Sequence, residues 1–184
     1  MNENIPLMTK SEMMDVSILS LSSLTGMDDI KGSRNILICM TEMNELSEEL
    51  CKYLLQKDYS LNGILEEYAD VQLAIWYLCM LCELPEQCIE SNMAHSDLLK
   101  GEMTKNAESI TEAIRRMNKC SHKIGDYLRG RSKNIQLQES VSNVQMSLTV
   151  LKNIFGFTDE QIYKSMTIKM LRVKERILLT GEHK

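Results

Sequence analysis

The sequence repeats itself at a displacement of 73 or 74 residues, and this repetition limits the folds that the chain can adopt. A shift of 74 aligns Met43-Asn44, Ser47 and Tyr53-Leu54 with Met117-Asn118, Ser121 and Tyr127-Leu128. A shift of 73 aligns Glu66, Val71-Gln72, Leu78, Ile89 and Met93 with Glu139, Val144-Gln145, Leu151, Ile162 and Met166. The offset changes within 57–63 and 130–135, where loops are expected. A fixed period of this kind indicates two copies of one supersecondary unit that share a core.

Each copy is expected to consist of three helices. The chain has only two prolines and eight glycines among 184 residues and is 43% hydrophobic. It is therefore poor in residues that interrupt helices and long enough to bury a core. We predict an all-α helical bundle built from two tandem repeats. The expected helices are 36–56, 60–83 and 86–100 in the first copy and 103–129, 135–155 and 159–179 in the second.

Turn-forming residues mark the helix ends and the organisation of the chain. Gly130 and Gly156 stand where a helix should end, and Thr158-Asp159 forms the cap region of the last helix. The expected organisation is a leader at 1–35 with one amphipathic helix around Ser11 to Ser22, followed by a single domain at 36–184 that contains the repeats at about 36–102 and 103–180. The leader could cover a site or pack on the bundle.

Four acidic residues are spaced so that they can meet. Glu42 and Glu45 form an E-x-x-E pair, and Glu67 and Asp70 form an E-x-x-D pair after 21 intervening residues. Positions i and i+3 share one face of a helix, so each pair directs two carboxylates to the same side. If the two helices pack antiparallel, the four carboxylates converge and repel one another unless a cation lies among them. Oxygen ligands suit a hard divalent ion, and the sequence predicts a magnesium site.

The second copy has lost these acids and carries positive charge instead. The counterparts of the four acids are Arg116, Lys119, Ser140 and Asn143. This copy therefore cannot build the same site. Residues 1–113 contain 7 basic and 20 acidic residues, whereas residues 114–184 contain 14 basic and 6 acidic ones. The chain thus has an acidic half and a basic half within a total net charge of −5.

The last helix of the second copy carries a basic stripe that the first copy lacks. This basic stripe is Lys169, Arg172 and Arg176, at i, i+3 and i+7, and its first-copy counterparts are Ser96, Leu99 and Met103. We interpret the chain as two fused ancestral subunits, of which one kept the acids for a metal and the other kept the bases for an anion. A ligand that needs divalent cations on one side and cationic side chains on the other is a polyphosphate. A nucleoside triphosphate is the leading candidate.

These residues together resemble the all-α nucleoside triphosphate pyrophosphohydrolases of the MazG and dimeric dUTPase superfamily. The resemblance lies in Glu42-Met-Asn-Glu45-Leu followed by Lys52, in Glu66-Glu67-Tyr-Ala-Asp70-Val, and in Lys169-x-x-Arg172-x-x-x-Arg176. It covers about 36–108, and the degraded second copy extends it to about 180. The resemblance implies a helical bundle, Mg²⁺ bound by the four acids with Mn²⁺ as a substitute, and hydrolysis between the α and β phosphates to a monophosphate and pyrophosphate. The basic stripe would neutralise the pyrophosphate leaving group.

Three further residues are candidates for the same site. Glu49 lies one turn beyond Glu45 and could accept the proton of the attacking water, or could belong to a solvated acidic face. Lys52 matches a lysine of the family and could touch phosphate or pair with an acid. Asn44 could bind a base or sugar edge, although its repetition as Asn118 argues equally for a structural role.

The cysteines and the apolar stretches indicate the compartment. The six cysteines are Cys39, Cys51, Cys79, Cys82, Cys88 and Cys120. Most fall at apolar positions of helix patterns, and no second pair stands at zinc-finger distance from Cys79-x-x-Cys82, so we expect buried free thiols and a reducing compartment. Charges interrupt every apolar stretch before about 18 residues, and no secretory signal opens the chain. We expect a cytoplasmic protein that does not span a membrane.

Two functions of other classes stay open. The first is a non-catalytic nucleotide-binding or sequestering protein on the same fold, because the second copy has already lost its acids. The second is a helical protein-interaction module whose charged halves hold each other or recruit a partner. Nucleic acid is not expected as a partner because the chain is net acidic. Members of the family commonly assemble as dimers or tetramers of single repeats. A fused pair resembles half of such a tetramer, so a homodimer is expected here, and the preferred base and sugar stay open.

Overall fold

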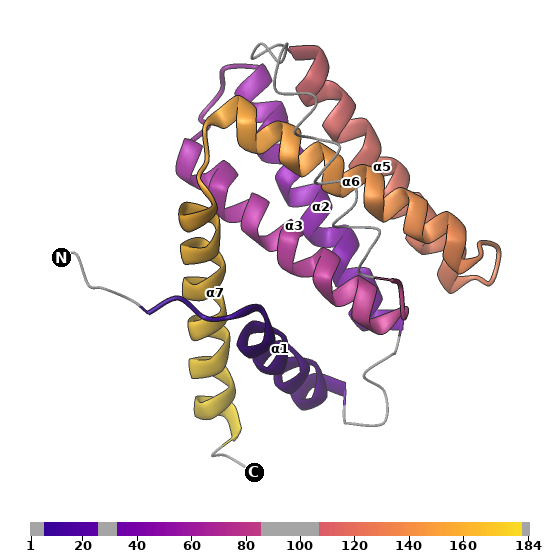
Figure 1. The fold of residues 1–184 in the computed structure, drawn as a ribbon, viewed down its shortest axis with the longest axis vertical. Helices are drawn as coiled ribbons and strands as arrows, with labels where there is room; N and C mark the ends of the chain where they lie inside the picture. Colours follow the sequence, from indigo (N-terminus) through magenta and orange to yellow (C-terminus); the bar gives the residue numbers. More distant parts are fainter. Residues whose placement is uncertain (1–5, 26–32, 86–106, 182–184) are drawn as a thin grey trace.

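The computed structural model describes residues 6–25, 33–85 and 107–181, and these residues form helices and no strands (Figure 1). The helices are α1 (Lys10–Thr25), α2 (Ser33–Leu54), α3 (Leu61–Leu81), α5 (Ala107–Leu128), α6 (Asn134–Phe155) and α7 (Asp159–Gly181). The all-α fold class is confirmed, and the expected helices are found wherever they fall on described residues. The expected helix 86–100 and the start of the expected helix 103–129 lie outside them.

Four helices form the centre of the bundle as two hairpins. α2 packs against α3 and α5 against α6, and the hairpins meet through α2 with α5 and through α3 with α6. Two buried glutamines join the hairpins between α3 and α6. The Gln72 amide donates to Gln145 Oε1 at 3.1 Å, and the Gln145 amide donates to Gln72 Oε1 at 2.9 Å. The two residues are 73 positions apart, so the copies meet through equivalent positions.

The positions that the two copies share in sequence are core positions. Met43 of α2 and Met117 of α5 are each 1% exposed, and Leu78 of α3 and Leu151 of α6 are fully buried. Burial of each such side chain stabilises the fold by roughly 1.5–3 kcal/mol. The copies have therefore kept the apolar faces that pack the hairpins together, while their charged positions have diverged.

The leader helix α1 packs on the bundle through α7. The two helices lie together on one side of the four-helix group, with α7 also against α3 (Figure 1). The backbone N–H of Met8 donates to Thr167 Oγ1 at 3.1 Å, and the Ser17 hydroxyl lies 3.3 Å from the sulfur of Met170. Met13 is fully buried in this contact region. Of the two expectations for the leader, packing on the bundle is the contact observed.

Capping residues determine where α6 ends and where α7 begins. Gly156 closes α6 with φ of 70°, a left-handed conformation that favours glycine. Thr158 then begins α7, because its backbone N–H donates to Gln161 Oε1 and its hydroxyl accepts from the Gln161 N–H. This reciprocal pair is a capping box and confirms the predicted cap region. It directs α7 back across the bundle to α3.

The described cysteines are free thiols, and four of them are buried. These four are Cys39, Cys79, Cys82 and Cys120. The expectation of burial is wrong for Cys51, which is exposed on α2, and Cys88 lies outside the described residues. Among the described helices, none combines the length and the apolar character needed to cross a bilayer.

Candidate metal and phosphate site

The structure brings three of the four predicted metal ligands into one cluster. Glu42 projects from α2, and Glu67 and Asp70 project from α3, so that one carboxylate oxygen of each lies within 4.8 Å of the others. We call these three residues the acid cluster. Glu45, the fourth predicted ligand, is exposed and lies outside the three, although its charge acts on Glu67 and Asp70. The pairing of α2 with α3 produces the convergence that the two spacings predict.

The acid cluster contains buried oxygen atoms without hydrogen-bond partners. They are Glu42 Oε2, Glu67 Oε2 and Asp70 Oδ1. A buried carboxylate oxygen without a donor costs free energy, because it has lost its water and gained no hydrogen bond. A divalent cation that prefers oxygen ligands could take one carboxylate oxygen from each of the three residues, because one such oxygen of each lies within 4.8 Å of the others. The donor set and its burial therefore fit Mg²⁺.

Mutual repulsion and burial perturb the titration of the acid cluster. Burial, followed by the charges of Asp70 and Glu45, raises the pKa of Glu67 to about 7. Burial also raises the pKa of Glu42 and of Asp70, although Lys169 opposes the rise at both. Carboxylic acids with pKa values shifted upward by burial and like charge are common at functional sites.

Lys169 of α7 is the cation that meets the acid cluster in this structure. Its ammonium donates a hydrogen bond to Asp70 Oδ2 and lies 3.7 Å from Glu42 Oε2. Burial alone would lower the pKa of Lys169, but the hydrogen bond to Asp70 and the surrounding carboxylates raise it overall. The first residue of the basic stripe thus lies against the acids of the other copy. Lys169 and Asp70 are 99 positions apart in the sequence.

A polar cavity opens beside this ion pair, between α3 and α7. Its volume is about 440 Å³, and it contains the whole basic stripe together with Glu67 and Asp70. Lys164 also lines it, a residue that our sequence reasoning missed. Lys164 stands eight positions before Arg172, two helical turns away and about 80° around the helix axis, so the spacing of the stripe does not include it. The cavity presents four cationic side chains next to buried carboxylates.

A second cavity lies on the other side of Lys169 and is mainly apolar. Its volume is about 400 Å³, and its apolar lining is Ile38, Leu73, Ala74, Tyr77, Met170 and Val173. Burial raises the pKa of Tyr77 to about 12. The polar and apolar cavities share Asp70, Lys169 and Arg176. The acid cluster therefore stands at the junction of a charged compartment and an apolar one.

The other candidate residues lie away from this junction. Lys52 contacts Glu49 at 2.7 Å and Glu48 at 3.0 Å, so pairing with acids is the alternative that the contacts favour for this lysine. Glu49 also lies beside the start of α3, where its Oε2 approaches Gly63. Asn44 is exposed. None of these three side chains lines either of the two cavities described above, and their roles stay predictions.

Trp76 contributes to packing outside the two cavities. Its ring lies 6.2 Å from the ring of Tyr163 on α7, and the Lys10 ammonium stands 5.1 Å above it. These contacts connect α3 with α7 and α1. They agree with a packing role for the single tryptophan of the chain.

Comparisons with known proteins do not assign the chain to a family. No protein-family model matches the sequence, and neither a curated protein nor a solved structure gives a match.

Proposed function

We propose that the chain is an Mg²⁺-dependent nucleoside triphosphate pyrophosphohydrolase, which cleaves the bond between the α and β phosphates to release a monophosphate and pyrophosphate. The observation that carries this proposal is the acid cluster with unpartnered buried oxygens, two members of which, Glu67 and Asp70, line the polar cavity together with the basic stripe. It is the arrangement that a metal-bound polyphosphate requires, with carboxylates for the cation and bases for the phosphates. We also propose that the chain is related to the MazG and dimeric dUTPase superfamily and that it forms a homodimer.

The two cavities suggest how a nucleotide would lie. Lys164, Arg172 and Arg176 in the polar cavity would bind the phosphates, because arginine grips phosphate oxygens in bidentate fashion. The apolar cavity would take the base and sugar, with Leu73 and Tyr77 in its wall. The α-phosphate would then lie at the junction, next to Asp70 and the rest of the acid cluster. This orientation places the scissile bond at the acids and the leaving pyrophosphate among the bases.

The chain's own residues have separable tasks in this reaction. Glu42, Glu67 and Asp70, with Glu45 beside them, would hold the metal, which when bound draws charge from the phosphates and lowers the pKa of a coordinated water. Lys169 must then exchange its contact with Asp70 for one with phosphate. Arg172 and Arg176 would neutralise the charge that develops on the leaving pyrophosphate.

Two carboxylates are candidates for the group that accepts the proton of the attacking water, Glu49 and Glu67. Glu49 forms an ion pair with Lys52 and lies on the side of α2 that faces the start of α3. Glu67, whose pKa is about 7, is closer to the junction, but it is also a candidate ligand of the metal. We keep Glu49 as the proposed base and expect its replacement to have a smaller effect than the loss of a residue from the acid cluster.

A non-catalytic nucleotide-binding or sequestering protein is the second candidate, and one contact favours it. Lys169 already supplies a positive charge to Asp70 and Glu42. A site whose acids are neutralised by an internal lysine can bind an anion through the remaining bases without any metal. In that case the chain would bind nucleotides tightly and release no product.

The deciding experiment measures pyrophosphate release from a panel of ribo- and deoxynucleoside triphosphates, with Mg²⁺ and with a chelator. The variant is Glu67→Gln, and the matched control is Glu139→Gln, an exposed acid at the second-copy position equivalent to Glu66. We expect metal-dependent release by the wild type and by the control, and its loss in Glu67→Gln. Metal-dependent nucleotide binding without release from any nucleotide would instead support the sequestering protein.

A further inference from the structure

The second copy contains a cavity at the place equivalent to the acid cluster. Its volume is about 220 Å³, and it lies between α5 and α6. It is lined by Glu112, Arg115, Arg116, Lys119, Ser140 and Asn143. The last four are the sequence counterparts of the four predicted metal ligands. The fold therefore brings these four positions together in both copies, although the second copy has no acid at any of them.

A second cavity adjoins the first and shares Glu112 and Arg116 with it. Its volume is about 270 Å³. Its residues Ser109, Ala113, Met146, Ser147 and Val150 are the counterparts of Asn35, Cys39, Leu73, Ala74 and Tyr77, which line the apolar cavity of the first copy. The second copy thus repeats the arrangement of a charged compartment beside a more apolar one. We call the two compartments of this copy the basic cavity, of 220 Å³, and the side cavity, of 270 Å³.

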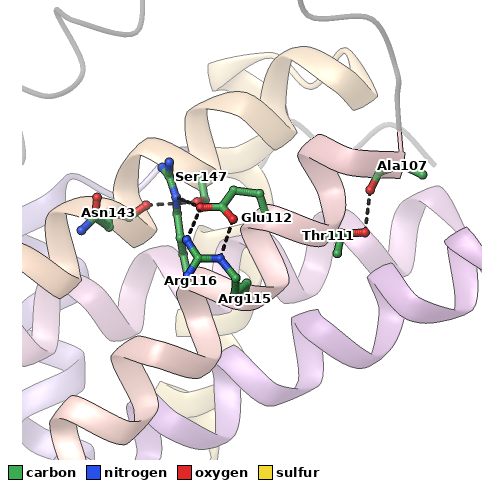
Figure 2. A network of polar contacts seen from close by, with 7 residues as sticks. All are labelled: Ala107, Thr111, Glu112, Arg115, Arg116, Asn143 and Ser147. Atoms are coloured by element: carbon green, nitrogen blue, oxygen red, sulfur yellow. Dashed lines mark hydrogen bonds and ion pairs between the residues drawn. The ribbon is translucent and has the colours of Figure 1, made fainter.

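Glu112 holds two arginines of the basic cavity in fixed positions. The Arg115 guanidinium donates to both Glu112 oxygens, at 2.6 and 2.8 Å, and Arg116 Nε donates to Glu112 Oε1 at 2.8 Å. Figure 2 shows Glu112 between these arginines, with Asn143 and Ser147 of α6 beside them. The hydrogen bonds from Arg115 and Arg116 lower the pKa of Glu112 to about 2. Glu112 therefore stays ionised and orients both cations at neutral pH.

The basic cavity has an excess of positive charge and of hydrogen-bond donors. Three cations and one anion line it, which leaves a net charge of +2. Lys119 is exposed, and within the described residues its ammonium has no hydrogen bond or ion pair. Asn143 adds a neutral amide, whereas the hydroxyl of the buried Ser140 donates to the Gln136 carbonyl at 3.0 Å. A cavity of this composition attracts an anion and repels a metal ion.

We propose that the second copy is a metal-independent binding site for a small organic phosphate of the nucleoside monophosphate class. The phosphoryl group lies in the basic cavity against Arg116 and Lys119, and the organic part lies in the side cavity against Met146 and Val150. Each cavity is below the roughly 300–1,000 Å³ of ordinary ligand pockets, and a monophosphate suits this size better than a triphosphate. The inference does not depend on turnover at the first-copy site.

The test is equilibrium binding of inorganic phosphate and of a panel of nucleoside monophosphates to the full chain, by calorimetry in the presence of a metal chelator. The variant Lys119→Gln removes one of the three cations of the basic cavity. Lys123→Gln is its matched control, because Lys123 lies one turn further along α5, pairs with Asp126 and lines neither cavity. Arg172→Gln reports binding at the first copy, and Val150→Phe fills the side cavity.

We expect a monophosphate to bind more tightly than inorganic phosphate, and Lys119→Gln to weaken both about tenfold, the loss of one charge-assisted contact. Lys123→Gln should bind as the wild type does, Arg172→Gln should keep the Lys119-dependent binding and lose only binding at the first copy, and Val150→Phe should weaken only the monophosphate. Equal losses in Lys119→Gln and Lys123→Gln would mean diffuse attraction and would overturn the proposal. It would also be overturned if only Arg172→Gln lost binding, if the wild type bound no phosphate saturably, or if phosphate and monophosphate bound equally.

Discussion

The two copies of the repeat present the same helical framework with opposite charge at its centre. In the first copy α2 and α3 bring together buried carboxylates with unpartnered oxygens, whereas the equivalent positions on α5 and α6 line a cavity of net positive charge. Some buried positions are identical in the two copies, as Met43 with Met117 and the Gln72–Gln145 pair illustrate, and others keep an apolar residue of a different kind, such as Tyr68 with Val141. Core packing restricts substitution because lost or added volume costs several kcal/mol, while a charge on a cavity wall can change with little cost to folding.

A single substitution can make the first copy resemble the second. Asp70→Asn places at the centre of the acid cluster the residue type that Asn143 supplies in the other copy. We expect it to lower pyrophosphate release by about a thousandfold or more, because a ligand of the metal is lost from the transition state. The free energy of unfolding should change little, since the relief of repulsion with Glu42 and Glu67 offsets the lost contact with Lys169. Turnover and denaturant unfolding measured on one preparation would check both parts, and turnover that survives in Asp70→Asn would refute the metal assignment.

Lys169 of the second copy contacts the acids of the first copy, and its replacement should have opposite effects on catalysis and on Mg²⁺ binding. In Lys169→Met the phosphates lose one cation, so kcat/KM should fall about a hundredfold. Mg²⁺ should nevertheless bind more tightly in the absence of nucleotide, because the ammonium no longer competes for Asp70. Metal titration and steady-state kinetics test the two halves of this prediction.

The control for this experiment is Lys174→Met, an exposed lysine of the same helix. It removes the same charge from the chain but lines neither first-copy cavity. If Lys174→Met strengthened Mg²⁺ binding as much as Lys169→Met does, the effect would come from net charge and not from competition at Asp70.

The sequence was sufficient to predict the helices and the convergence of the acids, because both depend on local spacing. The i, i+3 positions of Glu67 and Asp70 fix their common face, and a short loop before α3 leaves antiparallel packing against α2 as the simplest arrangement. The exposure of Glu45 could not be predicted, since it depends on how α2 is rotated about its axis. The contact of Lys169 with Asp70 depends on how α7 crosses α3, which no local pattern encodes.

The cavities were the least predictable feature of the site. Leu73 and Tyr77 read as ordinary core residues of an apolar helix, and only the packing of α1, α2 and α7 around them leaves a space. The second-copy cavities were missed for a different reason. Arg116 and Lys119 in place of acids indicate only that this copy cannot build the same metal site, whereas the cavity itself comes from the helical framework that the repeat predicts for both copies.

The glutamine pair tests whether the two hairpins are held in one arrangement by a shared polar contact. In Gln72→Leu the buried amide of Gln145 loses its partner, and the free energy of unfolding should fall by about 1–3 kcal/mol. Gln145→Leu should cost a similar amount for the same reason. The double variant should recover much of the loss, because no unpaired amide remains. A double-mutant cycle in urea measures this coupling, and simple additivity would show that the pair is not a mutual contact in solution.

The smallest effect that we expect is a pH dependence that distinguishes the acids of the two copies. The pKa of Glu67 is raised to about 7 in the folded chain, so the fold favours its protonated form, and this stabilisation is present below about pH 4.5 and lost as the pH rises to 7. Glu112 shifts the other way, to about 2, so its contribution is unchanged over this range. Metal-free protein should therefore be more stable at pH 5 than at pH 8 by roughly 1 kcal/mol after solvent screening.

Glu67→Gln should reduce that difference, Glu112→Gln should leave it unchanged, and saturating Mg²⁺ should remove it, because a bound cation favours the ionised acids. Thermal unfolding at the two pH values provides the measurement, and a pH dependence equal in both variants would place its origin outside the acid cluster.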